Sequence, residues 1–267
     1  MKKLTLECVS RQRSKEISVM LGSLLSQSFQ EWDLTILEEA DSNYLSDRYF
    51  VGLCRKLKDE GHIITLLHPK AILGSSVGII EVMKETKTPY AMKIDDDHFL
   101  EKDSLSKMIK TIEDPDIGAV GGMVQIIDRE LIPISDIPSD FNRWTGKLKD
   151  FWNDYSSMTF SYPEKVVDVD FVRAPFMYKA DILHDLGFLE TYPTLGYSQR
   201  AHRFESEVCN LLSKERSLRT VIHTGAKLWH FMSQTGGNRI RGSEGIKEDD
   251  EIYYKRWRDF HLKRGLE

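Results

Sequence analysis

The N-terminal third of the chain alternates between short apolar runs and longer stretches with helical spacing of apolar residues. Ile17, Met20, Leu21, Leu24 and Leu25 form one apolar stripe at helical spacing, which predicts a helix facing a core. The full pattern predicts strands over 4–9, 32–37, 63–67 and 90–94, and helices over 15–28, 49–58 and from Gly74 to about Glu85. Strands and helices that alternate at this pitch are typical of an α/β fold with a doubly wound, mostly parallel sheet.

Three consecutive aspartates, Asp95, Asp96 and Asp97, follow the fourth predicted strand. Clustered carboxylates repel one another unless a divalent cation or a ring of donors neutralises them. Ligands of doubly wound sheets bind at the carboxyl ends of the strands, where these aspartates lie. Side chains alternate along an extended segment, so we expect Asp95 and Asp97 to share a face and Asp96 to point away. A solvated acidic turn, or an N-cap for the next helix, is the alternative.

The rest of the chain continues the α/β pattern without an internal repeat or a low-complexity linker. We therefore predict a single domain over residues 1–267. An aromatic-rich segment, Pro133–Pro163, interrupts the periodicity and is either a packed excursion or part of a binding wall. Further helices are predicted over 104–112, 180–186, 204–212 and 249–263, and strands over 119–126, 166–172, 220–222 and 226–228.

The composition argues against several classes of protein. Hydrophobic residues make up 40% and charged residues 30%, and the net charge is −5. Such a charge gives no general attraction to nucleic acid or anionic membrane, so we expect no stable nucleic-acid binding. The three cysteines are scattered, which argues against a disulfide framework or a zinc site. No apolar stretch approaches the roughly 20 residues of a transmembrane helix, so we expect a soluble, cytoplasmic protein.

Five short motifs occur in an order that resembles a known family. They are Val9-Ser10 with Leu24–Phe29, Leu37–Ser42, Ile94–Asp97, Phe204–Glu207 and Trp229-His230. In this order they resemble a nucleotide-sugar glycosyltransferase of the GT-A fold, similar to the inverting glycosyltransferase family 2. The resemblance implies a Rossmann-like, mostly parallel sheet with a small antiparallel part and a C-terminal helix. It also implies a nucleotide-binding half over about 1–125, an acceptor half over about 126–235, and a loop with a closing helix over about 236–267.

The resemblance implies a role for each candidate residue of the donor site. Asp97 and His230 match the metal ligands of the family, with Mn²⁺ or Mg²⁺ as the ion. Asp95 matches the residue beside the ribose or the metal-bound waters, and Glu38 the residue that accepts a hydrogen bond from the nucleobase. The donor-binding set that we predict comprises Ser10, Arg11, Glu38, Asp95, Asp96, Arg239 and Arg241, with a structural role favoured for Asp96 and a lid over the diphosphate for the last two.

The catalytic base is predicted at Glu205 or Glu207. An inverting transfer needs one base opposite the leaving group, and Phe204–Glu207 resembles the family's acidic segment. Acidic residues that simply favour a helix N-terminus are the alternative.

One departure from the family is Gly74–Ile80, which lacks the arginine and asparagine of the family's G-x-x-x-A-R-N segment. Arg11 or Arg13 is the alternative source of positive charge.

These matches predict a metal-dependent inverting glycosyltransferase. Its donor would be a UDP- or GDP-sugar, and its acceptor a glycan or another hydroxyl compound. A non-catalytic nucleotide- or carbohydrate-binding relative and a sugar-phosphate nucleotidyltransferase are the alternatives.

Overall fold

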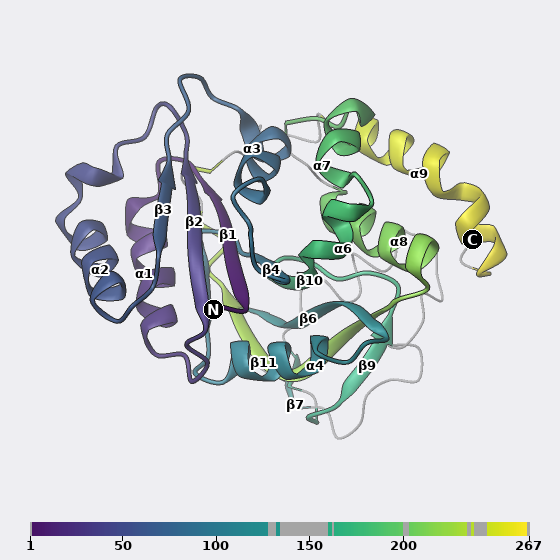
Figure 1. The fold of residues 1–267 in the computed structure, drawn as a ribbon, viewed down its shortest axis with the longest axis horizontal. Coiled ribbons are helices and arrows are strands. Elements are labelled where there is room, and N and C mark those ends of the chain that lie inside the picture. Colours follow the sequence, from purple (N-terminus) through teal and green to yellow (C-terminus); the bar gives the residue numbers. More distant parts are fainter. Residues whose placement is uncertain are drawn as a thin grey trace.

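The computed structural model describes residues 2–127, 132–133, 160–161, 163–199, 203–233, 236–237 and 245–265. One nine-stranded sheet forms the centre of this described part, in the order β3-β2-β1-β4-β10-β6-β11-β5, with β9 paired to β11. Helices cover both faces of the sheet (Figure 1). Strands from both halves of the sequence pair within this one sheet.

The N-terminal half contributes four parallel strands with helices between them. Their pairing runs β3-β2-β1-β4. The elements are β1 (Leu4–Ser10), α1 (Ser14–Leu25), β2 (Trp32–Glu38), α2 (Arg48–Asp59), β3 (Ile64–Leu67), α3 (Gly74–Met83), β4 (Tyr90–Lys93), β5 (His98–Leu100), α4 (Ser104–Ile112) and β6 (Ile117–Ile126).

The C-terminal half inserts antiparallel strands and adds a second group of helices. β10 lies antiparallel between β4 and β6, and the long strand β11 pairs with β6, β9 and β5. The elements are β7 (Ile132–Pro133), β8 (Phe160–Ser161), β9 (Val166–Val169), β10 (Phe176–Lys179), α6 (Ala180–Asp185), α7 (Phe188–Thr191), α8 (Phe204–Arg216), β11 (Arg219–His230) and α9 (Ile246–Lys263).

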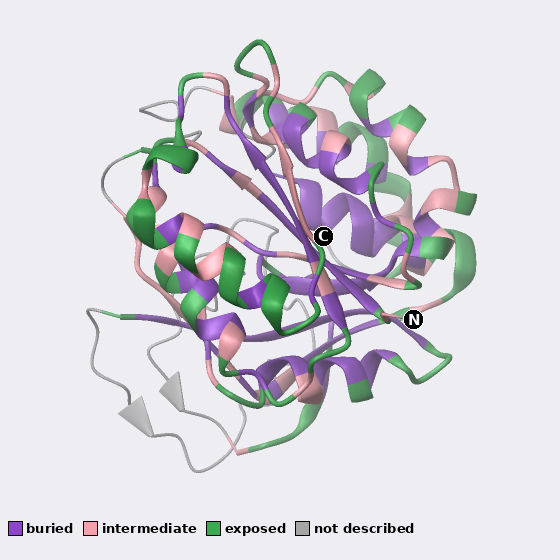
Figure 2. Cartoon of the chain, turned by 60° about the vertical axis from the view of Figure 1, so that its left-hand side comes forward, coloured by how far each residue is buried: buried purple, intermediate pink, exposed green. Residues whose placement is uncertain are grey.

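The sheet separates two apolar cores. Met20 of α1, Leu57 of α2 and Leu105 of α4 belong to one core, whereas Ile79 of α3 and Phe204 of α8 belong to the other. Figure 2 shows buried strands between helices whose outer faces are exposed. The apolar stripe predicted on the first helix faces the sheet as expected, because Ile17, Met20, Leu21 and Leu24 are fully buried and Leu25 is partly buried.

Several elements differ from the sequence-based expectation; for example, helix α7 was not predicted, and the strand expected over 166–172 ends at Val169. The short strand β5 and the antiparallel strand β10 were not predicted, and the two strands expected over 220–222 and 226–228 form the single strand β11. Most of the aromatic-rich segment Pro133–Pro163 lies outside the described residues. Within the described ranges, no helix combines the length and apolar character needed to cross a bilayer.

Candidate active site

The carboxyl ends of β1, β2 and β4 meet at one edge of the sheet. Ser10 pairs in register with Glu38, and Glu7 pairs with Lys93. Asp96, in the turn that follows β4, lies within hydrogen-bond distance of Ser10 at the end of β1. The Ser10 hydroxyl accordingly donates a hydrogen bond to Asp96 Oδ2 at 2.5 Å.

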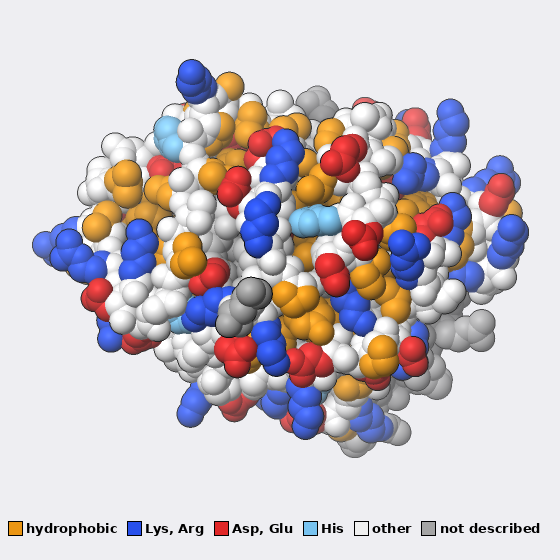
Figure 3. Space-filling view, in the orientation of Figure 1, with side chains coloured by type: hydrophobic (Ala, Val, Ile, Leu, Met, Phe, Trp, Pro, Cys, Tyr) orange, Lys and Arg blue, Asp and Glu red, His pale blue; other side chains and the backbone are white. Residues whose placement is uncertain are grey.

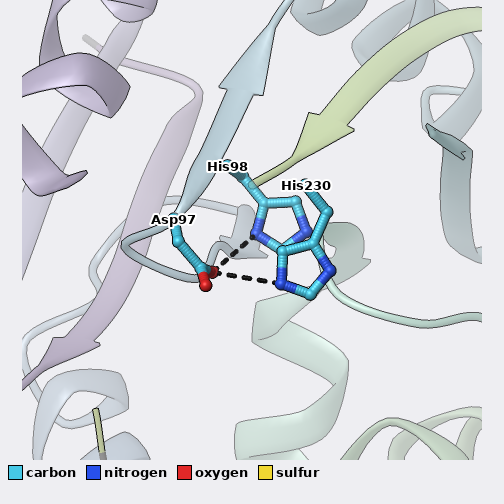
Figure 4. Close-up of side chains that lie close together, drawn as sticks. All are labelled: Asp97, His98 and His230. Atoms are coloured by element: carbon cyan, nitrogen blue, oxygen red, sulfur yellow. Dashed lines mark ion pairs between the residues drawn. The ribbon is translucent and has the colours of Figure 1, made fainter. Parts of the chain in front are cut away.

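Asp97 lies at the centre of a cluster with two histidines. Its Oδ1 atom is 3.3 Å from Nε2 of His230 and 3.8 Å from Nδ1 of His98 (Figure 4). His98 and His230 are paired residues of the antiparallel strands β5 and β11, and their rings stack with centroids 4.4 Å apart. The cluster therefore joins residues more than 130 positions apart in the sequence through backbone pairing.

The charges around Asp97 keep its carboxylate ionised. Burial acts to raise the pKa of Asp97, but the hydrogen bond with His230 and the charges of His98, His230 and Arg13 lower it well below its usual range. Burial and the neighbouring His230 lower the pKa of His98 to about 4. The cluster thus presents a carboxylate beside a neutral imidazole at neutral pH, which are the protonation states that metal ligands need.

Arg13 neutralises the other side of the aspartate cluster. One guanidinium nitrogen, Nη1, donates to Asp96 Oδ1 at 2.8 Å and to Asp97 Oδ2 at 3.1 Å. All three side chains are at most 5% exposed. Burial raises the pKa of Asp96 to about 6 despite this pairing. Of the two arginines suggested by the sequence, Arg13 is thus the one that contacts the aspartates.

The prediction that Asp96 points away from Asp97 is wrong. It assumed an extended backbone, whereas β4 ends at Lys93 and the chain turns at Asp96 and Asp97. The turn directs both side chains to Arg13, and Asp95 instead pairs with Lys93.

Lys93 links the aspartates to Glu205. Its ammonium lies 2.9 Å from Asp95 Oδ1 and 3.0 Å from Glu205 Oε1. Burial acts to lower the pKa of Lys93, but the two carboxylates outweigh it and raise the pKa well above its usual range. Glu205, on α8, therefore lies beside the end of β4 and is held there by the Lys93 ammonium.

Glu207 faces away from this site. Two residues along a helix correspond to a rotation of about 200°, so Glu207 points to α9 when Glu205 points to β4. The Glu207 carboxylate accepts hydrogen bonds from Tyr197, from Trp257 Nε1 at 2.7 Å and from Arg256 Nε at 3.2 Å. Burial raises the pKa of Glu207. These contacts give Glu207 a packing role between α8 and α9.

Glu38 and Arg11 are held by neighbours at the ends of β1 and β2. Glu38 is 2% exposed and accepts a hydrogen bond from the Tyr44 backbone amide, with His68 Nδ1 3.6 Å away. Arg11 forms a bidentate pair with Asp41, in which its Nη2 lies 2.8 Å from Oδ2. The structure therefore brings Glu38 to the same sheet edge as the aspartates and directs Arg11 to Asp41.

The start of the glycine-rich segment packs on the loop after β1. The Gly237 amide donates to the Arg11 carbonyl at 2.7 Å. A Cβ at Gly237 would lie 2.8 Å from Arg13 Cζ, and φ is +75° there, so glycine allows this close approach. Arg239 and Arg241, which we predicted to form a lid, lie outside the described residues.

Sequence reasoning missed Lys93 and His98. Both carried a signal in the printed sequence: Lys93 is a charged residue inside an apolar strand, and His98 directly follows the aspartates. The pairing of β5 with β11, which brings His98 to His230, could not be inferred without the sheet order.

The residues of this cluster fit a divalent cation. Ligand atoms of Asp97, His98 and His230 all lie within 4.8 Å of one another. A carboxylate and imidazoles are ligands that Mn²⁺ and related ions accept. Acidic and basic side chains are interspersed over the face of the molecule shown in Figure 3.

Solved structures with a related fold are glycosyltransferases. The mannosyltransferase PcManGT from Pyrobaculum calidifontis, in complex with GDP-Man and Mn²⁺, has a TM-score of 0.60 at 13% identity, covering 96% of this chain and 64% of that one. S. aureus TarS 1-349 in complex with UDP has a TM-score of 0.54 at 11% identity, covering 94% and 64%. GalNAc-T7 with UDP, GalNAc and Mn²⁺ has a TM-score of 0.62 at 8% identity, covering 94% and 47%.

These likenesses confirm the predicted GT-A fold. This chain spans less than two thirds of the length of each of the three structures. A search of curated proteins finds no match to the sequence.

The sequence model described as glycosyl transferase family 2 matches residues 9–183, which is more than half of the chain. The chain therefore belongs to glycosyl transferase family 2.

Proposed function

We propose that this protein is a metal-dependent, inverting glycosyltransferase that moves a sugar from a nucleoside diphosphate sugar to a hydroxyl acceptor. The observation that carries the proposal is the approach of Asp97 to His230, at 3.3 Å, at the carboxyl edge of the sheet. When bound there, a divalent cation would supply Lewis-acid stabilisation of the departing diphosphate. Asp97 and His230 are the residues that we predicted from the sequence as its ligands.

Glu205 is the residue best situated to act as the base. It lies next to the aspartate cluster through Lys93, whereas the Glu207 carboxylate is occupied by Tyr197, Arg256 and Trp257. In the transfer, the acceptor oxygen attacks the anomeric carbon, and the bond from that carbon to the diphosphate oxygen breaks. Glu205 takes the acceptor proton, and the diphosphate leaves with the bonding electron pair. A single displacement of this kind inverts the configuration at the anomeric carbon.

The proposed donor is a UDP- or GDP-sugar. Support comes from the related folds, since PcManGT is in complex with GDP-Man and another TarS structure is in complex with UDP-GlcNAc. Ser10, Glu38 and Asp95 lie at the ends of β1, β2 and β4, where doubly wound sheets bind nucleotides. We propose that they contact the nucleoside, with Arg13 near the diphosphate.

A thermal-shift screen tests the proposal most directly. UDP, GDP, ADP and their sugars are each added with and without Mn²⁺, and we expect one nucleotide to stabilise the protein only when Mn²⁺ is present. In the transfer assay with the donor so identified, Asp97→Asn should remain folded and lose turnover in saturating Mn²⁺. Full transfer by Asp97→Asn would overturn the metal assignment, and nucleotide binding without transfer or donor hydrolysis would instead indicate a non-catalytic relative.

A further inference from the structure

His98 is a buried histidine whose ring nitrogens are left unsatisfied. It is 1% exposed, and neither Nδ1 nor Nε2 has a hydrogen-bond partner among the described residues. A polar group buried without a partner costs about 1–3 kcal/mol, so such a group generally has a partner that completes it. A metal ion bound in the Asp97 cluster would satisfy one of these two ring nitrogens.

The two oxygens of Asp97 are assigned to different neighbours. Oδ2 accepts from Arg13 Nη1 at 3.1 Å and from the Ser233 backbone amide at 3.2 Å. Oδ1 instead faces the two histidines, at 3.3 Å from His230 Nε2 and 3.8 Å from His98 Nδ1 (Figure 4). The protein thus fixes the carboxylate through one oxygen and directs the other to both imidazoles, an arrangement typical of an oriented metal ligand.

We infer that His98 is a third protein ligand, so that the ion is held by Asp97, His98 and His230 together. This inference rests on the proposed function for the site and extends it beyond the two ligands predicted from the sequence. Ligand atoms about 2.1 Å from one ion lie roughly 3.0–3.5 Å apart when adjacent, and the spacings of Oδ1 from the two imidazoles are close to this range.

Three ligands with two imidazoles change which ion the site prefers. Mg²⁺ favours oxygen ligands and keeps most of its waters, whereas imidazole favours Mn²⁺, Co²⁺ and Zn²⁺ over Mg²⁺. Three protein ligands also hold an ion without help from a diphosphate. The site therefore binds Mn²⁺ or Co²⁺ before the nucleotide and discriminates against Mg²⁺.

Electron paramagnetic resonance of Mn²⁺ tests this inference in the absence of nucleotide. Titration of the wild-type protein with Mn²⁺ alone should show one site, and pulsed measurements of coupled ¹⁴N should count two imidazoles. His98→Phe keeps an aromatic ring against His230 and should weaken Mn²⁺ binding at least tenfold, with one coupled imidazole remaining. His98→Asn serves as a second variant if the phenylalanine does not fit, and His223→Phe, on the same strand as His230, is the matched control that should bind as the wild type does.

The outcomes separate this inference from the proposed function. One coupled imidazole in the wild type, or unchanged Mn²⁺ affinity in both His98 variants, overturns the role of His98 and leaves glycosyl transfer untouched. Two coupled imidazoles in a protein that transfers no sugar from any donor supports the three-ligand site and overturns the proposed function. Mg²⁺ that displaces Mn²⁺ at comparable concentration contradicts the predicted selectivity.

Discussion

The Nζ atom of Lys93 lies 3.0 Å from Oε1 of Glu205 and so joins the end of β4 to the first turn of α8. The same ammonium lies 2.9 Å from Asp95. The Lys93 ammonium therefore connects Asp95 to the proposed base Glu205, although Lys93 belongs to neither of the two acidic motifs.

Replacing Lys93 by methionine should destabilise the protein. The substitution keeps the volume but leaves the Asp95 and Glu205 carboxylates without their shared cation. Because Asp95 is 43% exposed, water screens it, and we expect a loss of about 1–3 kcal/mol that comes chiefly from the nearly buried Glu205 carboxylate. Urea unfolding measures the effect. Lys84→Met is the matched control, because Lys84 pairs with Glu81 at the surface and its loss should change the free energy of unfolding by less than about 1 kcal/mol. Equal effects of the two substitutions would contradict the bridging role of Lys93.

Substitution of Glu205 should lower the rate of transfer, whereas substitution of Glu207 should lower the stability of the protein. Glu205→Gln should lower kcat by about 10²–10⁴-fold, the usual contribution of a general base, while Mn²⁺-dependent nucleotide binding persists. Glu207→Gln should chiefly lower the unfolding free energy, because Glu207 holds Arg256 and Trp257 of α9. Transfer kinetics and urea unfolding of both variants decide the matter. A Glu205→Gln enzyme with full kcat would exclude Glu205 as the base.

Arg13→Met should make the protein depend more strongly on a metal ion. Without the guanidinium, Asp96 and Asp97 are two adjacent buried carboxylates with no arginine between them, so the metal-free protein should lose about 3–5 kcal/mol. An added cation then supplies the missing charge, and the rise in Tm on adding Mn²⁺ should exceed that of the wild type. Arg11→Met is the control, since Arg11 pairs with Asp41 and not with this cluster. Equal Mn²⁺ shifts in wild type and Arg13→Met would refute the prediction.

The elements that were predicted correctly are those with a clear local periodicity of apolar residues in the sequence. The helix expected over Ser104–Ile112 has these bounds in the structure, and the first three strands lie within a residue of those expected. The strands that were missed lack a local signal. β5 has three residues, too few for a visible alternation, and β10 owes its place to pairing with β4 and β6, which are distant in sequence.

The spatial grouping of the candidate residues was predictable where they follow strands and unpredictable where it depends on strand pairing. Clustered acids at a strand end indicated Asp97, and order along the chain indicated His230. The directions of Asp95 and Asp96 were not predictable, because a turn replaces the extended backbone after Lys93. The sequence suggested Arg11 or Arg13 as a source of positive charge but could not distinguish them, because the contact of Arg13 requires the loop after β1 to fold back over the turn that carries Asp96 and Asp97.

Glu7 gives the stability of the protein a dependence on pH that is independent of the active site. It is fully buried on β1 and accepts hydrogen bonds from Thr86, at 2.6 Å, and from Tyr178. Burial raises the pKa of Glu7 from 4.5 to about 7. Because the folded protein holds this proton more tightly than the unfolded chain, the stabilisation is complete below pH 4.5 and is lost as the pH rises through 7.

Glu7→Gln should remove this dependence. Glutamine keeps the shape without titrating, so the unfolding free energy of the wild type relative to the variant should fall by up to about 3 kcal/mol between pH 4.5 and 8. Urea unfolding at several pH values measures the difference. Glu81→Gln, at an exposed position on α3, should stay within about 0.5 kcal/mol of the wild type throughout. A difference between wild type and Glu7→Gln that stays constant with pH would show that Glu7 is not protonated in the folded protein, and its hydrogen bonds with Thr86 and Tyr178 would then be those of a carboxylate.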